Sequence, residues 1–218
     1  MRAVTRPLAL AGALVTVALV LLPPLGTAAE HLFSAHMMQH LLLIVVAAPL
    51  LVLSHAVRVQ DARLLRPLFR PVTAWLLFVG IFLFWHWPAA FQWAARNPAS
   101  RLLEHATIFC SACFFWSVAL APRRDAALNY GARALFVMTA AVATDLPGVI
   151  MLFAPQAICT MPAENSFRWG LSPLEDQQIA GLLMWVPANL AFFSFATWLF
   201  ARWISGDGQL LPHKSVTT

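Results

Sequence analysis

Charge is what this sequence lacks most. Of its 218 residues, 11% are Asp, Glu, Lys or Arg and 61% are hydrophobic, whereas about 25% of a soluble protein is charged. This composition excludes a soluble domain and predicts an integral membrane protein surrounded by lipid. No alternating strand pattern indicates a barrel, so helices are the expected way to cross the bilayer. No stripe of basic and aromatic residues points to nucleic acid as a partner.

Cysteine is also scarce, with three in the chain. Cys110 and Cys113 fall inside an apolar run and Cys159 in a predicted loop, which argues against a disulfide-linked external domain. The spacing of Cys110 and Cys113 places both thiols on one side of a helix, where small side chains favour close helix packing.

Six apolar segments predict an all-α, polytopic membrane helix bundle. They are residues 5–22, 32–53, 72–94, 101–121, 132–154 and 177–201, each near the roughly 20 residues that a spanning helix needs. Residues 1–204 would form one transmembrane domain, and residues 205–218 a polar tail. The first segment also fits a signal peptide, because Arg2 and Arg6 precede it and small residues follow at 27–29. Cleavage of residues 1–29 would leave five spans.

The basic residues predict the orientation. With the N-terminus inside, eleven Lys and Arg residues are cytoplasmic and three are external, which favours cytoplasmic termini under the positive-inside rule. The external residues are Arg96, Arg101 and Arg168, and the cytoplasmic ones are Arg2, Arg6, Arg58, Arg63, Arg66, Arg70, Arg123, Arg124, Arg133, Arg202 and Lys214.

Five of the seven histidines fall in the outer half of three predicted spans under this topology. His36 and His40 lie four residues apart, on one face of a helix, while His55 and His213 fall on the cytoplasmic side. Ionisable groups inside a membrane are costly and indicate a functional site with partners at the same depth. The five are His31, His36, His40, His86 and His105.

Further polar groups are predicted at that depth. A carboxylate beside a ligating histidine fixes its tautomer and raises its basicity, so these residues are expected to support the imidazoles: Glu104, Asp145, Asp176, Gln177 and the soft Met184. Pro88 and Pro147 should each break a helix next to a polar residue, and irregular backbone at membrane depth is tolerated where it lines a cavity.

The histidines predict a metal or cofactor site. Imidazole suits zinc, copper and iron, and the thioethers of Met37 and Met38 would favour reduced copper. Two histidines on facing helices could instead hold a b-type haem. The pair His36 and His40 is awkward for one haem iron, since axial ligands approach from opposite faces, but it suits an ion bound from one side.

Several motifs resemble the CtaG-type cytochrome c oxidase assembly factor family and occur in its order over residues 31–190. They are HMMQHLLL at 36–43 with APLL at 48–51, WHWP at 85–88, LEH at 103–105 and, most specifically, LSPLEDQQIAGLLMWVP at 171–187. The resemblance implies a bacterial inner-membrane protein that assists the biogenesis of haem–copper oxidases. It carries over His36, His40, His86, His105, Asp176, Gln177 and Met184.

The expected function is a non-enzymatic assembly factor that holds copper in an outer-leaflet site. Its metal ligands would be His36, His40, His86 and His105, with His31, Met37 or Met38 exchanging the ion. Its partners would be oxidase subunits or a copper chaperone. Two rivals are a haem-binding oxidoreductase acting on quinol and a copper permease, for which the inner halves of the spans offer few soft ligands.

Overall fold

The computed structural model describes residues 2–55, 67–122, 126–159, 161 and 169–206. This part of the chain is helical and contains no strand, which confirms the predicted all-α membrane bundle. His213, most of the predicted tail and the basic residues at 58–66, 123–124, 168 and 214 lie outside it. The helices are α1 (Arg2–Leu21), α2 (Leu25–Ala28), α3 (Phe33–Leu42), the π-helix η1 (Leu43–Ala47), α4 (Ala48–Ser54), α5 (Pro71–Trp85), α6 (Pro88–Arg96), α7 (Pro98–Ala119), α8 (Tyr130–Phe153) and α10 (Pro173–Ile204).

Four stretches of the described chain are long and apolar enough to cross a membrane. They are Phe33–Ser54, Pro98–Ala119, Tyr130–Phe153 and Pro173–Ile204, and the bent pair α5–α6 makes a fifth if it counts as one span. The first predicted span is a shorter apolar helix over Thr5–Leu21. It packs on η1 and α4, where Val20 is buried with Leu43 and Ala47.

The two predicted proline breaks have different outcomes. The break at Pro88 is confirmed, because α5 ends at Trp85 and α6 leaves at an angle of 72°. The break at Pro147 is wrong, because α8 continues through this residue to Phe153. Proline is tolerated inside membrane helices when neighbouring groups satisfy or shield the carbonyl that it leaves free.

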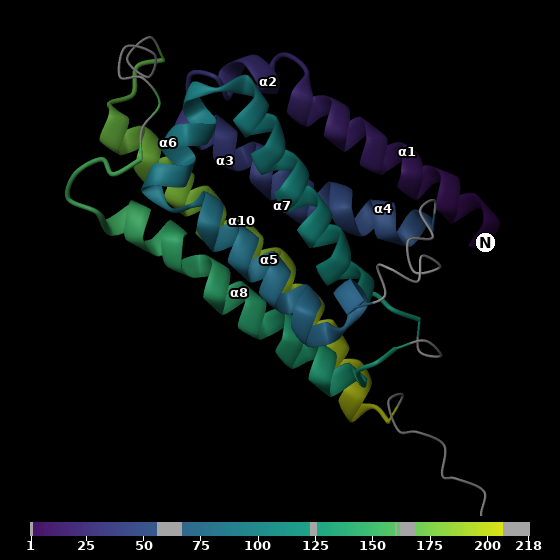
Figure 1. Ribbon diagram of the computed structural model, residues 1–218. Coiled ribbons are helices and arrows are strands. Elements are labelled where there is room, and N and C mark those ends of the chain that lie inside the picture. Colours follow the sequence, from purple (N-terminus) through teal and green to yellow (C-terminus); the bar gives the residue numbers. More distant parts are fainter. Residues whose placement is uncertain (1, 56–66, 123–125, 160, 162–168, 207–218) are drawn as a thin grey trace, which may run out of the picture.

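The helices form one elongated bundle (Figure 1). The short helices α2 and α6 lie at one end of it, beside the beginnings of α7 and α10, while the start of α1 and the end of α10 lie away from them. Aromatic rings pack together in the core. The ring centroid of Phe115 lies 4.6 Å from that of Phe78, in a tilted contact, and 4.7 Å from that of Phe136, in a stacked one.

A π-helical turn, η1, joins α3 to α4. In its i to i+5 register the carbonyl of Ile44 would pair with residue 49, but Pro49 has no N–H to donate. The indole Nε1 of Trp116 in α7 donates to that carbonyl instead, at 2.7 Å. The irregular turn is thus satisfied by a side chain from a neighbouring helix.

Two glycines bring α8 and α10 into close contact. A Cβ on Gly181 would lie 2.6 Å from the carbonyl oxygen of Gly148 and 2.8 Å from the amide of Leu152. Small residues let membrane helices approach in this way without a hydrophobic driving force between them.

We expect Gly181→Ala to destabilise the protein by about 1–3 kcal/mol, the usual cost of overpacking, because its methyl group would meet rigid backbone. Thermal unfolding of the full chain in detergent measures the effect. Gly80→Ala is the matched control, since Gly80 has open space around its Cβ position and alanine favours a helix. Equal melting temperatures for the two variants would contradict the close helix contact.

Candidate metal centre

Helix α3 supplies the first two groups of the site. His36 and His40 are 0% and 2% exposed, and their ring centroids lie 4.5 Å apart. A helix places residues i and i+4 on one face, and this face of α3 points into the bundle. The prediction that these two histidines lie on the same face of one helix is therefore confirmed.

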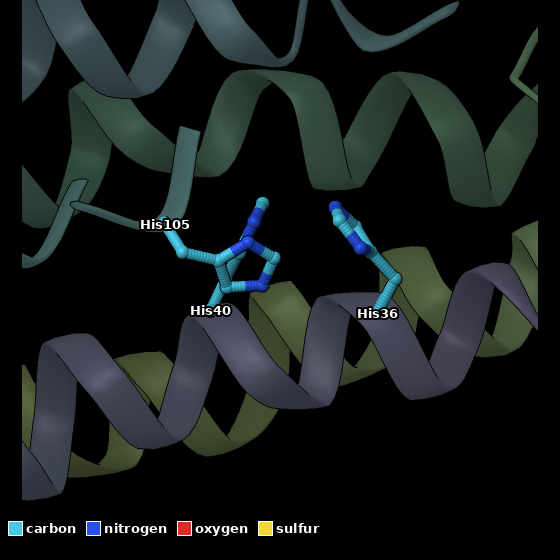
Figure 2. A group of neighbouring side chains, drawn as sticks. All are labelled: His36, His40 and His105. Carbon is cyan, nitrogen blue, oxygen red and sulfur yellow. The ribbon is translucent and has the colours of Figure 1, made fainter. Parts of the chain in front are cut away.

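Helix α7 adds His105 from the opposite side (Figure 2). Its ring centroid lies 5.1 Å from that of His36 and 5.1 Å from that of His40. One nitrogen from each of the three rings lies within 4.8 Å of the other two. Rings from two helices thus converge on one small volume.

A carboxylate lies among these rings. Glu104 is fully buried, with Oε2 3.2 Å from Nε2 of His36 and Oε1 3.6 Å from Nε2 of His40. Although these atoms are close enough for an ion pair, none of them has a hydrogen-bond partner with acceptable geometry. Glu104 was predicted to support the imidazoles, and it contacts His36 and His40 through different oxygens, while the three histidines form the group whose ligand atoms all lie within 4.8 Å of one another.

The spacing of these atoms suits a shared ion. Metal–ligand bonds of about 2.0–2.1 Å place two ligand atoms of a tetrahedral ion about 3.3 Å apart, and the two nitrogen–oxygen distances here are 3.2 and 3.6 Å. A cation at the centre would engage one nitrogen each of His36 and His40 and an oxygen of Glu104, which are buried atoms without hydrogen bonds, and one nitrogen of His105. The residues present therefore fit a metal ion.

His86 lies beside this cluster but outside the group of three. Its ring centroid is 5.5 Å from that of His40, and its Nδ1 lies 2.6 Å from the carbonyl oxygen of Phe82. His105 makes the same kind of contact, from Nδ1 to the carbonyl of Arg101 at 2.8 Å. Metal-binding histidines usually donate their second ring N–H to such an acceptor. For His86 this leaves Nε2 without a partner, whereas Nε2 of His105 faces Gln39.

Sequence reasoning missed Gln39. Its Oε1 lies 3.1 Å from Nε2 of His105, and its Nε2 donates to the carbonyl of Val20 in α1 at 2.5 Å. Gln39 therefore connects the first helix to the histidine cluster. Its position between two histidines in an apolar span was the available signal, since every polar group in a span needs a partner.

Asp176 and Gln177, the polar residues of α10 that were predicted to support the imidazoles, hydrogen-bond to the backbone of other segments instead. Both oxygens of Asp176 accept from the start of α3, at 2.7 Å from the amide of Phe33 and 3.0 Å from that of Ser34. Gln177 accepts from the amides of Ile158 and Cys159 and donates to the carbonyl of Met151. Asp176 thus positions the helix that carries His36 and His40.

Asp145 and the loop cysteine lie apart from the rings. Both oxygens of Asp145 accept from Asn189 in α10, at 2.9 and 3.0 Å. Asp145 therefore joins α8 to α10 and does not support an imidazole as predicted.

Burial raises the pKa of the Cys159 thiol to about 11, which keeps it protonated at neutral pH.

The remaining predicted ligands divide between two cavities. His31 lines an open pocket of about 470 Å³ that reaches Gln39 and His105 and is also lined by Glu30, Arg96 and Arg101. Met37 and Met184 line a second, smaller pocket with His40 and His86. Met38 is half-buried and lines neither of them.

The family model of the cytochrome c oxidase caa3 assembly factors matches residues 2–206 of the chain. No curated protein and no solved structure matches it.

We expect Asp176→Asn to destabilise the protein by about 1–3 kcal/mol. An amide offers a single acceptor oxygen to the two backbone amides at the start of α3, which leaves a buried donor without a partner. Chemical unfolding of the purified chain measures the change.

Glu175→Gln is the control for this variant. Glu175 is exposed and forms a capping box with Ser172, and glutamine can take the same role. If both substitutions have the same small effect, Asp176 does not fix α3.

Proposed function

Since the chain belongs to the cytochrome c oxidase caa3 assembly factor family, we propose that it assists oxidase assembly by binding copper at His36, His40, His105 and Glu104. In this proposal it is not an enzyme; it holds the ion and releases it to an oxidase subunit or receives it from a copper chaperone. It resides in the bacterial plasma membrane with both termini in the cytoplasm and the cluster in the outer leaflet.

The observation that carries this proposal is the buried Glu104 carboxylate among imidazoles that lack hydrogen bonds. Desolvating a carboxylate is expensive unless it is paired or bound to a metal. A copper ion would balance its charge and use the lone pairs of the rings together. Imidazole nitrogen is a good ligand for copper.

The open pocket beside His105 provides an access route. It is lined by Glu30 and His31, by Gln39 and His105, and by Arg96 and Arg101, so an imidazole and a carboxylate are available to an ion in the pocket, beside two guanidinium groups. Displacing Gln39 from Nε2 of His105 would then free this nitrogen for the ion. In this scheme His31 captures the ion and His105 passes it inward.

The geometry does not favour the haem alternative. A porphyrin must lie between its two axial histidines, but His36, His40 and His105 pack edge to face with centroids 4.5–5.1 Å apart. The visible spectrum of the purified protein distinguishes the two, because a reduced haem band would favour the oxidoreductase.

We expect His40→Ala to lower copper affinity about 10–100-fold, the usual cost of damaging a metal site. Metal analysis and titration of the purified full chain measure this, and Glu104→Gln should act in the same direction because it removes the charge. His213→Ala, outside the described residues, is the control. Unchanged copper binding in a well-folded His40→Ala protein would contradict the proposal.

In cells we expect deletion of the gene to lower assembled oxidase activity while the oxidase polypeptides are still made. Excess external copper should restore part of the activity, because mass action can replace a carrier. His40→Ala should resemble the deletion, with its protein level checked by blotting. Normal oxidase activity with a normal level of His40→Ala protein would exclude a role for the cluster in assembly.

A further inference from the structure

We propose that the chain has a second copper position, specific for Cu(I), formed by Met37, Met184 and His86 and joined to the first by His40. This inference deepens the proposed function and rests on it. The first cluster offers nitrogen and carboxylate oxygen, whereas the second offers thioether sulfur and nitrogen. Two positions with different ligand chemistry would allow the ion to move inside the protein.

The second position is a small pocket lined by residues of α3, η1, α5, α8 and α10 and by His86 at the end of α5. Its volume is about 30 Å³, more than the roughly 10–15 Å³ that one water needs. Met37, His40, His86 and Met184 line it together with apolar and aromatic side chains. Both methionines are largely buried, at 1% and 7% exposure, so the sulfur atoms are held inside the bundle.

His86 is prepared to act as a ligand there. Its Nδ1 donates to the carbonyl of Phe82 at 2.6 Å, and in a neutral ring this leaves the lone pair on Nε2. That nitrogen is buried and has no hydrogen-bond partner. Methionine in a helix bundle is commonly a packing residue, but packing does not explain an unpaired buried nitrogen on a residue that lines the same pocket.

The ligand set selects the oxidation state. Thioethers are soft ligands that suit Cu(I), whereas Zn²⁺ is borderline and is commonly bound by imidazole, thiolate and carboxylate. The residues that line this cavity within the described chain include no Asp or Glu. A single positive charge is therefore easier to hold here than a double one, because burial penalises charge steeply.

His40 connects the two positions. It lines the small pocket, and its Nε2 lies 3.6 Å from Oε1 of Glu104 in the first cluster. A Cu(I) ion can exchange His36, His105 and Glu104 for His86 and the two sulfur atoms while His40 stays nearby. The step is ligand exchange, so the copper keeps its oxidation state and no reductant is required.

The backbone also makes room for Met184. A Cβ on Gly148 of α8 would lie 3.3 Å from the Cβ of Met184, tighter than an ordinary contact. The glycine therefore lets α10 approach α8 closely enough to bring this methionine to the cavity.

The test is anaerobic titration of the purified full chain with Cu(I) against a colorimetric chelator, together with X-ray absorption at the copper edge. We expect sulfur scattering from copper in the natural protein. Met37→Leu/Met184→Leu should remove the sulfur signal and lower Cu(I) affinity about 10–100-fold. Leucine replaces methionine with little change in volume, so the fold should persist.

Zn²⁺ titration and a third variant provide the controls. Zn²⁺ should bind the double variant as tightly as the natural protein, because this ion uses the imidazole–carboxylate cluster. Met38→Leu should leave the affinities for Zn²⁺ and for Cu(I) unchanged. Cu(I) with nitrogen and oxygen scattering alone, or equal losses for Zn²⁺ and Cu(I) in the double variant, would overturn the second position. If the natural protein binds neither ion, the proposed function fails as well.

Discussion

The structure depends on how a buried carboxylate is accommodated inside a helix bundle. Glu104 has no exposed surface, and an isolated charge at this depth would be prohibitively expensive. Three helical segments converge around it: α3 with two imidazoles, α7 with its own His105, and the end of α5 with His86. Other contacts then serve to hold these segments, including the Asp176 carboxylate at the start of α3 and the Gln39 bridge to α1.

Much of this arrangement could be predicted from the sequence. Apolar runs define the spans, and the four-residue spacing of His36 and His40 fixes their shared face without any tertiary information. The sequence could not show the role of Glu104. Adjacent residues on a helix point about 100° apart, so it is the position of α3 against α7 that lets both Glu104 and His105 face the same cluster.

The polar residues of α8 and α10 show where sequence reasoning fails. The sequence places Asp145 inside a predicted span and Asp176 at the start of one. Once a metal site is predicted, both carboxylates become candidates to hydrogen-bond a ligating imidazole. One instead caps a helix 142 residues away in the chain, and the other binds Asn189. Such partners depend on which helices are neighbours. The predicted break at Pro147 is wrong for a related reason. Whether a helix continues through a proline depends on the groups packed around it and not on the proline alone.

The π-helical turn η1 connects the local spacing of the histidines to the packing of the helices. Its hydrogen bonds run from residue i to i+5, one residue further than in the α-helix that it interrupts, and it lies between His40 and Pro49. Removing one residue from it would turn α3 by about 100° relative to α4 and carry His36 and His40 away from α7. The number of residues between these histidines and α4 is therefore as strictly fixed as the identity of the ligands. An insertion in a surface loop would not change the direction in which the two histidines point.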